Sequence, residues 1–373
     1  MATKLVNGPP AVSRGQRFGR PQVIASGLLF AFLGQGLWLA RRVPLSPLEL
    51  GYINSGPGAA SSPVIVLVAH QAGRLFGVSA AAPGWPVRIP FLMVGVLLGA
   101  SLWYIARRLH GNAAGYLALS LYSFSPTMIT YAAHVGPETF AAWAVFGGVF
   151  TAIAVAHTLY APREVILWNW QRILLLGAAI GVGAGAQVST VMAVPIGLAF
   201  MWYLAPERRP AALAILAASC GIAAGVFWAS HGFSCSAVFS DIRSAGFSEV
   251  SFGAFSSRAV WRILGVLLLR NGPGFILLLL TSAVTFVGWP YTRFFGTLAP
   301  LLVTVVLVCF ALVFPYAAGF SFLVIGLPFL FVFVAGVFAD LFQSRWGSFA
   351  FGIVLACLVM NAYFSFNGLL QVQ

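Results

Sequence analysis

The sequence predicts an all-α protein, a polytopic transmembrane helical bundle. Hydrophobic residues make up 60% of the chain and charged residues only 7%, whereas a soluble domain carries about 25% charged residues. So few charges cannot cover 373 residues with a wetted surface. The apolar stretches are continuous and do not alternate with polar residues, which favours spanning helices over a barrel. We therefore expect an integral, multi-pass membrane protein with lipid around it.

The apolar runs predict about 11 spans, because a spanning helix needs about 20 mainly apolar residues. The pair of runs within 173–205 is short in each half, and Gln187 with Ser189 marks a turn there, so its span count stays open. The candidate spans are 22–40, 88–106, 113–131, 139–160, 173–187, 190–205, 211–230, 272–289, 296–315, 319–339 and 348–368.

The two ends of the chain predict its orientation. Residues 1–21 read as a flexible, basic, cytoplasmic N-terminus, and 22–373 as a single transmembrane domain. The first apolar run is longer than the core of a signal peptide, so we expect a retained anchor. With the N-terminus in the cytoplasm, twelve of the 20 Lys and Arg fall in short inside segments near helix ends, as the positive-inside rule requires. We expect the C-terminus outside, in a bacterial inner membrane.

The net charge of +13 is explained by this loop bias. The basic residues are not clustered with aromatic residues, so nucleic acid is not expected as a partner. The cysteines show no paired spacing, and we expect neither a disulfide nor a cysteine metal site. They are Cys220, Cys235, Cys309 and Cys357.

Two predicted outer loops are long, at about 41–87 and 230–271. The first holds Glu49, a stretch rich in Gly, Ser and Pro, and then an apolar piece over 64–76. That piece predicts a helix at the membrane surface, with His70 and Arg74 four residues apart on one face.

Two of the seven acidic residues are candidate catalytic groups, Glu49 and Glu138, both on the predicted outer face. Two carboxylates on one face can act as general base and as an orienter of substrate or metal. Arginines on that face, Arg74 and Arg88, could hold phosphate. A divalent metal stays open, and the residues that would bind it are unknown.

Each of these residues also has a structural interpretation. Glu138 follows Pro137 at a predicted helix start, where an acid is stabilised by the helix dipole. Glu49 could simply pair with Arg41 or Arg42. Arg88, just before a span, could be an interfacial anchor.

The order of motifs from residue 22 to 205 resembles the GT-C class of glycosyltransferases that use lipid-phosphate sugars, including the protein mannosyltransferase and aminoarabinose transferase relatives. The acid Glu49 is followed by Tyr52, and Ser62-Pro63 opens the surface helix. Four further matches follow along the chain: Arg74-Leu75-Phe76-Gly77, Arg88-Ile89-Pro90, Tyr122-Ser123-Phe124-Ser125-Pro126 and Glu138.

The resemblance implies transfer of a sugar from a polyprenyl-phosphate donor to an acceptor on the outer face of the membrane. Glu49 matches the outer-loop catalytic acid, Glu138 the second acid, and Arg88 the arginine before the second span. We place Arg74, Tyr52 and His70 with Arg88 in the substrate site. The family's carboxylate takes the acceptor's proton as the phosphate leaves, and the lipid carrier needs an apolar groove.

The sequence also departs from the family pattern. The first loop has Glu49 where the family usually has an Asp-Glu or similar pair, and the Arg-Tyr-type motif before the penultimate span is replaced by Gly319-Phe320-Ser321-Phe322. A non-catalytic scaffold, or a subunit with membrane-complex partners, is therefore an alternative. A lipid or solute transporter ranks third, because neither mid-span charges nor inverted repeats are evident.

Overall fold

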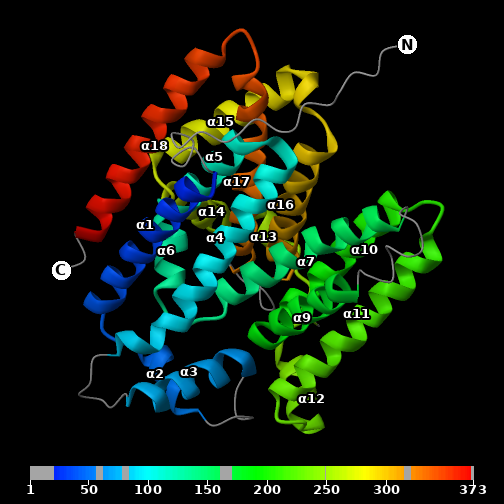
Figure 1. The fold of residues 1–373 in the computed structure, drawn as a ribbon. Helices are drawn as coiled ribbons and strands as arrows, with labels where there is room; N and C mark the ends of the chain where they lie inside the picture. Colours follow the sequence, from blue (N-terminus) through cyan, green and yellow to red (C-terminus); the bar gives the residue numbers. More distant parts are fainter. Residues whose placement is uncertain are drawn as a thin grey trace, which may run out of the picture.

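The computed structural model describes residues 21–55, 62–77, 84–159, 170–247, 249–314 and 321–370, and every regular element within them is a helix (Figure 1). This confirms the predicted all-α bundle. Of the expected flexible N-terminus, residues 1–21, the first twenty lie outside the described residues and Pro21 begins α1; Gly319 and Phe320 also lie outside the described residues.

The described helices follow one another along the chain with no strand between them. The first half contains α1 (Pro21–Arg42), α2 (Pro47–Asn54), α3 (Pro63–Phe76), η2 (Trp85–Arg88), α4 (Ile89–His110), α5 (Asn112–Ser123), α6 (Pro126–Ala132), α7 (Glu138–Thr158) and α9 (Trp170–Ala186). The second contains η3 (Val188–Ala193), α10 (Val194–Leu204), α11 (Arg209–Ser230), α12 (Cys235–Ser244), α13 (Gly253–Ser256), α14 (Arg258–Leu269), α15 (Pro273–Gly288), η4 (Pro290–Thr292), α16 (Phe295–Val313), α17 (Ser321–Phe342) and α18 (Gly347–Leu370).

All eleven predicted spans are helical, but not all are long enough to cross a bilayer alone. Seven described segments pass a test of length and hydropathy: α1, η2 with α4, α7, α11, α16, α17 and α18. The pair α14 and α15 passes together but bends by 108°. The predicted spans at 173–187 and 190–205 correspond to α9 and to η3 with α10, which are shorter apolar helices.

The predicted span 113–131 is broken into α5 and α6. Pro126 stands at the first turn of α6, and a proline disfavours helical backbone in the residue before it. Ser125 caps α6 by accepting a hydrogen bond from the Met128 amide at 3.2 Å. Its hydroxyl also donates to Asn271 Oδ1 at 2.5 Å, which ties the break to the α14–α15 corner.

The core is centred on α17, of which 94% of the apolar window is buried. It packs against α16, α5, α7 and α4. Phe329 of α17 contacts Phe146 and Phe150 of α7, with ring centroids 5.0 and 5.7 Å apart. The abundant phenylalanine therefore fills the interior as well as facing outward.

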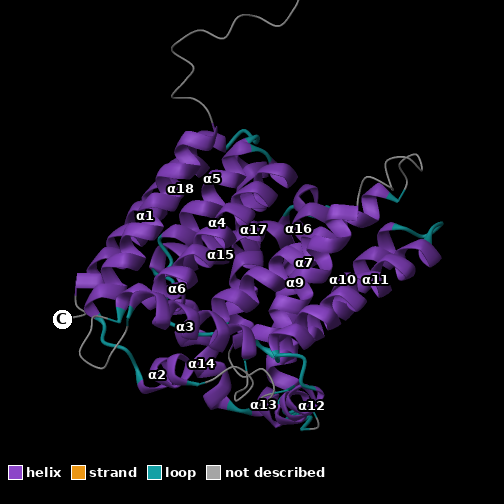
Figure 2. Ribbon diagram, turned by 60° about the horizontal axis from the view of Figure 1, so that its bottom comes forward, coloured by secondary structure: helices purple, strands orange, loops and turns teal. Residues whose placement is uncertain are grey.

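Several short helices gather at one end of the bundle, which we call the α2–α3 end (Figure 2). The predicted surface helix is α3, and it rests on α2, η2 and α9. Its residues Ile65, Val66, Ala69 and Ala72 are buried in these contacts. That this end faces outward remains a prediction.

Candidate active site

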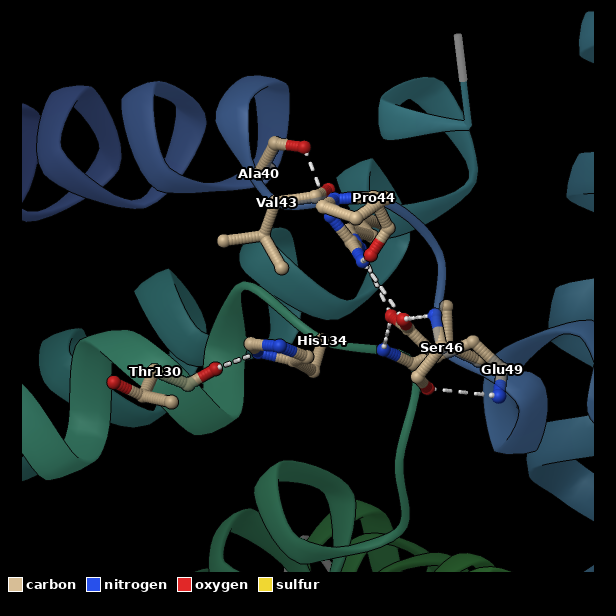
Figure 3. Close-up of polar contacts among 9 residues, drawn as sticks. Ala40, Val43, Pro44, Ser46, Glu49, Thr130 and His134 are labelled. Carbon is tan, nitrogen blue, oxygen red and sulfur yellow. Dashed lines mark hydrogen bonds and ion pairs between the residues drawn. The ribbon is translucent and has the colours of Figure 1, made fainter. Parts of the chain in front are cut away.

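Glu49 is held at the start of α2 by its own helix. Ser46 is the N-cap: its hydroxyl accepts from the Glu49 amide at 3.2 Å, and Glu49 Oε2 accepts from the Ser46 amide at 2.8 Å. This reciprocal capping box, read from Ser46-Pro47-Leu48-Glu49, fixes the carboxylate's direction. The Glu49 side chain points inward, toward the C-terminal end of α1 (Figure 3).

Arg88 forms a bidentate ion pair with Glu49. Its Nε donates to Oε1 at 2.8 Å and its Nη2 to Oε2 at 2.7 Å. The remaining donors reach the carbonyls of Ala40, Val43 and Pro44 at 2.9, 2.7 and 3.0 Å. A guanidinium has five N–H groups, and all five are used here. Arg88 therefore has no N–H left for a phosphate in this conformation.

The pair is enclosed, with side-chain exposures of 0% for Arg88 and 2% for Glu49. Glu49 Oε1 also accepts from the Val135 amide at 2.9 Å. Burial alone would raise the pKa of Glu49, but the hydrogen bonds from Arg88, Ser46 and Val135 outweigh it, so the pKa lies below its ordinary value. Both Glu49 oxygens are engaged, and its predicted action as a base stays a prediction.

Glu138 lies at the same end, because the Val135 contact brings the α6–α7 loop beside Glu49. It is half-buried at the first position of α7, as the sequence predicts. Burial and the negative charge of Glu138 raise the pKa of Tyr52 on α2 and of Tyr131 on α6. Within the described residues Glu138 has no ion-pair partner.

Two further residues complete this group. His134 Nδ1 lies 2.7 Å from the Thr130 carbonyl (Figure 3), so that nitrogen is the donor of this hydrogen bond. The positive charge of Arg270, at the end of α14, partly offsets the rise in the Tyr131 pKa. We call Tyr52, Tyr131, His134, Glu138 and Arg270 the Glu138 cluster.

An apolar cavity of about 360 Å³ lies beside this cluster. Its walls come from α14, α16 and α17, with Thr127 of α6 as one of its few polar residues. Thr127 is one helical turn before Tyr131, so the cavity borders the cluster at this point of α6. Leu268, another lining residue, is two residues before Arg270 in the chain. The cavity is lined almost entirely by apolar residues.

The other predicted substrate residues are placed less centrally. His70 Nδ1 lies 3.1 Å from the Ile53 carbonyl, which joins α3 to α2. Arg74 is exposed at the end of α3. The structure thus groups Tyr52 with Glu138, pairs Arg88 with Glu49, and leaves Arg74 on the surface.

Sequence reasoning missed Tyr131 and Arg270 as site candidates. Tyr131 lies inside an apolar run, and Arg270 counts only as one arginine among several in a loop. The one available signal was Arg270-Asn271-Gly272-Pro273, a helix break that sets the arginine at a corner.

Comparisons with known proteins agree with this fold. Residues 60–231, a little under half of the chain, match the sequence model of the dolichyl-phosphate-mannose-protein mannosyltransferase family. A search of curated protein sequences finds no match.

Solved structures show the same likeness. ArnT from Cupriavidus metallidurans in the apo state is 16% identical over 91% of this chain and 63% of its own, with a TM-score of 0.61. The ArnT structure bound to undecaprenyl phosphate is 16% identical over 91% of this chain and 64% of its own, with a TM-score of 0.59. The apo oligosaccharyltransferase of Archaeoglobus fulgidus is 14% identical over 95% of this chain and 56% of its own, with a TM-score of 0.55.

The chain therefore has a GT-C glycosyltransferase fold, which confirms the resemblance read from its motifs. It spans between half and two thirds of the length of these solved structures.

A divalent metal finds little support in the residues. One archaeal oligosaccharyltransferase structure contains zinc and sulfate. In the part of this chain that is described, no three His, Cys, Asp or Glu side chains gather to hold a metal ion. Because both Glu49 oxygens are already bound, the site offers the single carboxylate of Glu138, which does not fit a metal centre.

Proposed function

We propose that this protein is a glycosyltransferase that moves a sugar from a polyprenyl-phosphate donor to an acceptor at the outer face of the membrane. The observation that carries the proposal is the apolar cavity of about 360 Å³ that borders the Glu138 cluster. A polyprenyl chain needs an apolar surface, and its phosphate needs a cation where that surface ends. The apolar cavity and Arg270, two residues after the lining residue Leu268, support this proposal.

The walls of the cavity match an isoprenoid chain. Leu264, Leu267 and Leu268 of α14 face Leu327 and Leu330 of α17. Arg270 follows at the end of α14, exposed, and within the described residues it has no carboxylate within ion-pair distance. A donor lying in the cavity would present its phosphate to Arg270 and Tyr131.

The chemistry is a single displacement at the anomeric carbon. A hydroxyl or amine of the acceptor attacks that carbon, the bond from carbon to the phosphate oxygen breaks, and polyprenyl phosphate leaves. Glu138 takes the acceptor's proton, and Arg270 offsets the charge that develops on the phosphate. No step needs a metal ion.

In this proposal Glu49 and Arg88 position the site. Their ion pair fixes the end of α1, the start of α2 and the loop that leads to Glu138. Loss of the pair should misplace Glu138 without removing a reacting group. This assigns to Glu138 the base role that the family resemblance gives to Glu49.

The experiment measures release of polyprenyl phosphate by the full chain in lipid nanodiscs supplied with polyprenyl-phosphate sugars. Glu138→Gln and Arg270→Gln should each lower the rate by at least about a hundredfold, the usual scale for one such group. Glu249→Gln and Arg108→Gln are matched controls, because both side chains are exposed and lie outside the cluster. Full activity of Glu138→Gln would refute its assignment.

A non-catalytic subunit is a second candidate, favoured by one observation: Glu49, the residue that matches the family's catalytic acid, is buried in an ion pair with Arg88. Purification in a stoichiometric complex, without turnover of any donor, would support this alternative over the transferase.

A further inference from the structure

We propose that the segment from α12 to α14 lies in the headgroup region of the bilayer, with its aromatic side chains against lipid. From its sequence, this segment is expected to be part of a long loop outside the membrane, at about 230–271. Its side chains are arranged with apolar groups outward and an acid inward, which a water-facing loop does not show. The inference concerns a surface and does not depend on the proposed function.

The acid and the histidine of this segment are turned inward. His231 at the end of α11 and Asp241 of α12 form a pair 3.2 Å apart, with side-chain exposures of 2% and 6%. The other ring nitrogen of His231 lies 2.9 Å from the Phe227 carbonyl. The pair satisfies these polar groups internally and fixes α12 on the end of a span.

The large apolar side chains are turned outward instead. Phe239 is 72% exposed and Phe252 is 69% exposed. Exposing so many apolar side chains close together to water is unfavourable. Further exposed members of this surface are Phe233, Ile242, Val250, Phe255, Trp261, Ile263, Val266 and Leu269.

Helix α12 shows the separation most clearly. Cys235, Phe239 and Ile242 are spaced by four and three residues, so they form one exposed apolar stripe. Ser240 and Arg243 are also exposed and lie on the adjoining side of the helix. An amphipathic helix of this kind lies along a membrane surface, with its apolar side toward the acyl chains.

The exposed charges on the segment fit lipid phosphates. They are three arginines, Arg243, Arg258 and Arg262, against one acid, Glu249, and the exposed Arg270 follows directly after α14. Trp261 needs no water for its indole, because Nε1 donates to the Phe255 carbonyl at 2.8 Å. Tryptophan and arginine at the end of spanning helices are typical of the lipid interface.

The surface is also continuous with the membrane-spanning part. Helix α12 follows the span α11 directly, and α14 leads into α15 through the 108° bend. The segment is therefore joined at one end to a membrane-spanning helix and at the other to an apolar helix pair that passes the span test only as a unit. These observations favour lipid over a protein partner as the occupant.

The test uses spin labels on the full chain in phospholipid nanodiscs, with Cys235→Ser to remove the exposed native thiol. Labels at Phe239→Cys and Phe252→Cys should collide several-fold more often with oxygen than with a water-soluble nickel chelate. A label at Ser240→Cys, the matched control on the same helix, should show the reverse preference. All three positions are exposed, so these changes spare the core.

Two outcomes would overturn the inference. Strong relaxation by the nickel chelate at Phe239→Cys and Phe252→Cys would place the stripe in water. Low collision with both reagents at these positions would mean that protein covers the surface.

Discussion

Replacing Glu49 by Gln tests the central ion pair of the site. The carboxylate accepts four hydrogen bonds, two from Arg88 and one each from the Ser46 and Val135 amides. A glutamine amide has one acceptor oxygen, and its NH₂ group would face donors. The substitution also leaves the guanidinium of Arg88 without a counter-charge at 0% exposure.

We expect Glu49→Gln to lower the free energy of unfolding by about 3–5 kcal/mol, the cost of removing one partner from a buried pair. Equilibrium unfolding of the purified chain in mixed micelles, followed by tryptophan fluorescence, measures this loss. Glu249→Gln, which removes an exposed acid outside the pair, should change it little.

A double-mutant cycle makes the test specific to the pair. Arg88→Met removes the other charge, so the double variant should lose less than the sum of the two single losses. The reasoning is refuted if the free energy of unfolding of Glu49→Gln equals that of Glu249→Gln. It is also refuted if the loss in the double variant equals the sum of the losses of Glu49→Gln and Arg88→Met.

The lowered pKa of Glu49 predicts that acid destabilises the protein. The contribution of this carboxylate to the free energy of unfolding is complete above its ordinary pKa of 4.5 and is lost as the pH falls through the lower pKa of the folded state. Unfolding measured as a function of pH should show this loss, and Glu49→Gln should remove it. Leu327→Trp should fill the apolar cavity and raise the donor KM several-fold, whereas Leu355→Trp on the exposed side of α18 should not; equal KM values would argue against a donor in the cavity. Gly272→Ala should cost about 1–3 kcal/mol from its φ of +97° alone. A Cβ there would also clash with Asn361 Oδ1, and Gly288→Ala, with open space around it, is the control in the same thermal unfolding assay.

The fold could be predicted because lipid imposes a simple rule on sequence. Long apolar runs had to be helical, and all eleven proposed runs are, although the run at 113–131 is divided into α5 and α6 and the run at 190–205 into η3 and α10. The breaks were harder, since the Ser123–Pro126 interruption is stabilised by Asn271, which lies 146 residues away from Ser125.

The candidate site was predicted in part. Ser46-Pro47-Leu48-Glu49 carries a local capping signal, and Pro137-Glu138 marks a helix start, so both acids could be found. The partner of Glu49 could not, because Arg41 and Arg42 are much closer in sequence than Arg88. Long-range pairing depends on the packing of η2 against α1, which leaves no local pattern.

The contacts of Glu49 also order events during synthesis. Arg88 is translated 39 residues after Glu49, and Val135 follows 86 residues after it. When the first hydrophobic segment of a nascent chain has been inserted into the membrane, Glu49 has been synthesised. Its counter-ion Arg88 and its amide donor Val135 are synthesised later. The loop that holds Glu49 can reach its folded conformation only after two further segments have entered the membrane. In a chain stalled before Val135, this loop should therefore remain sensitive to proteases.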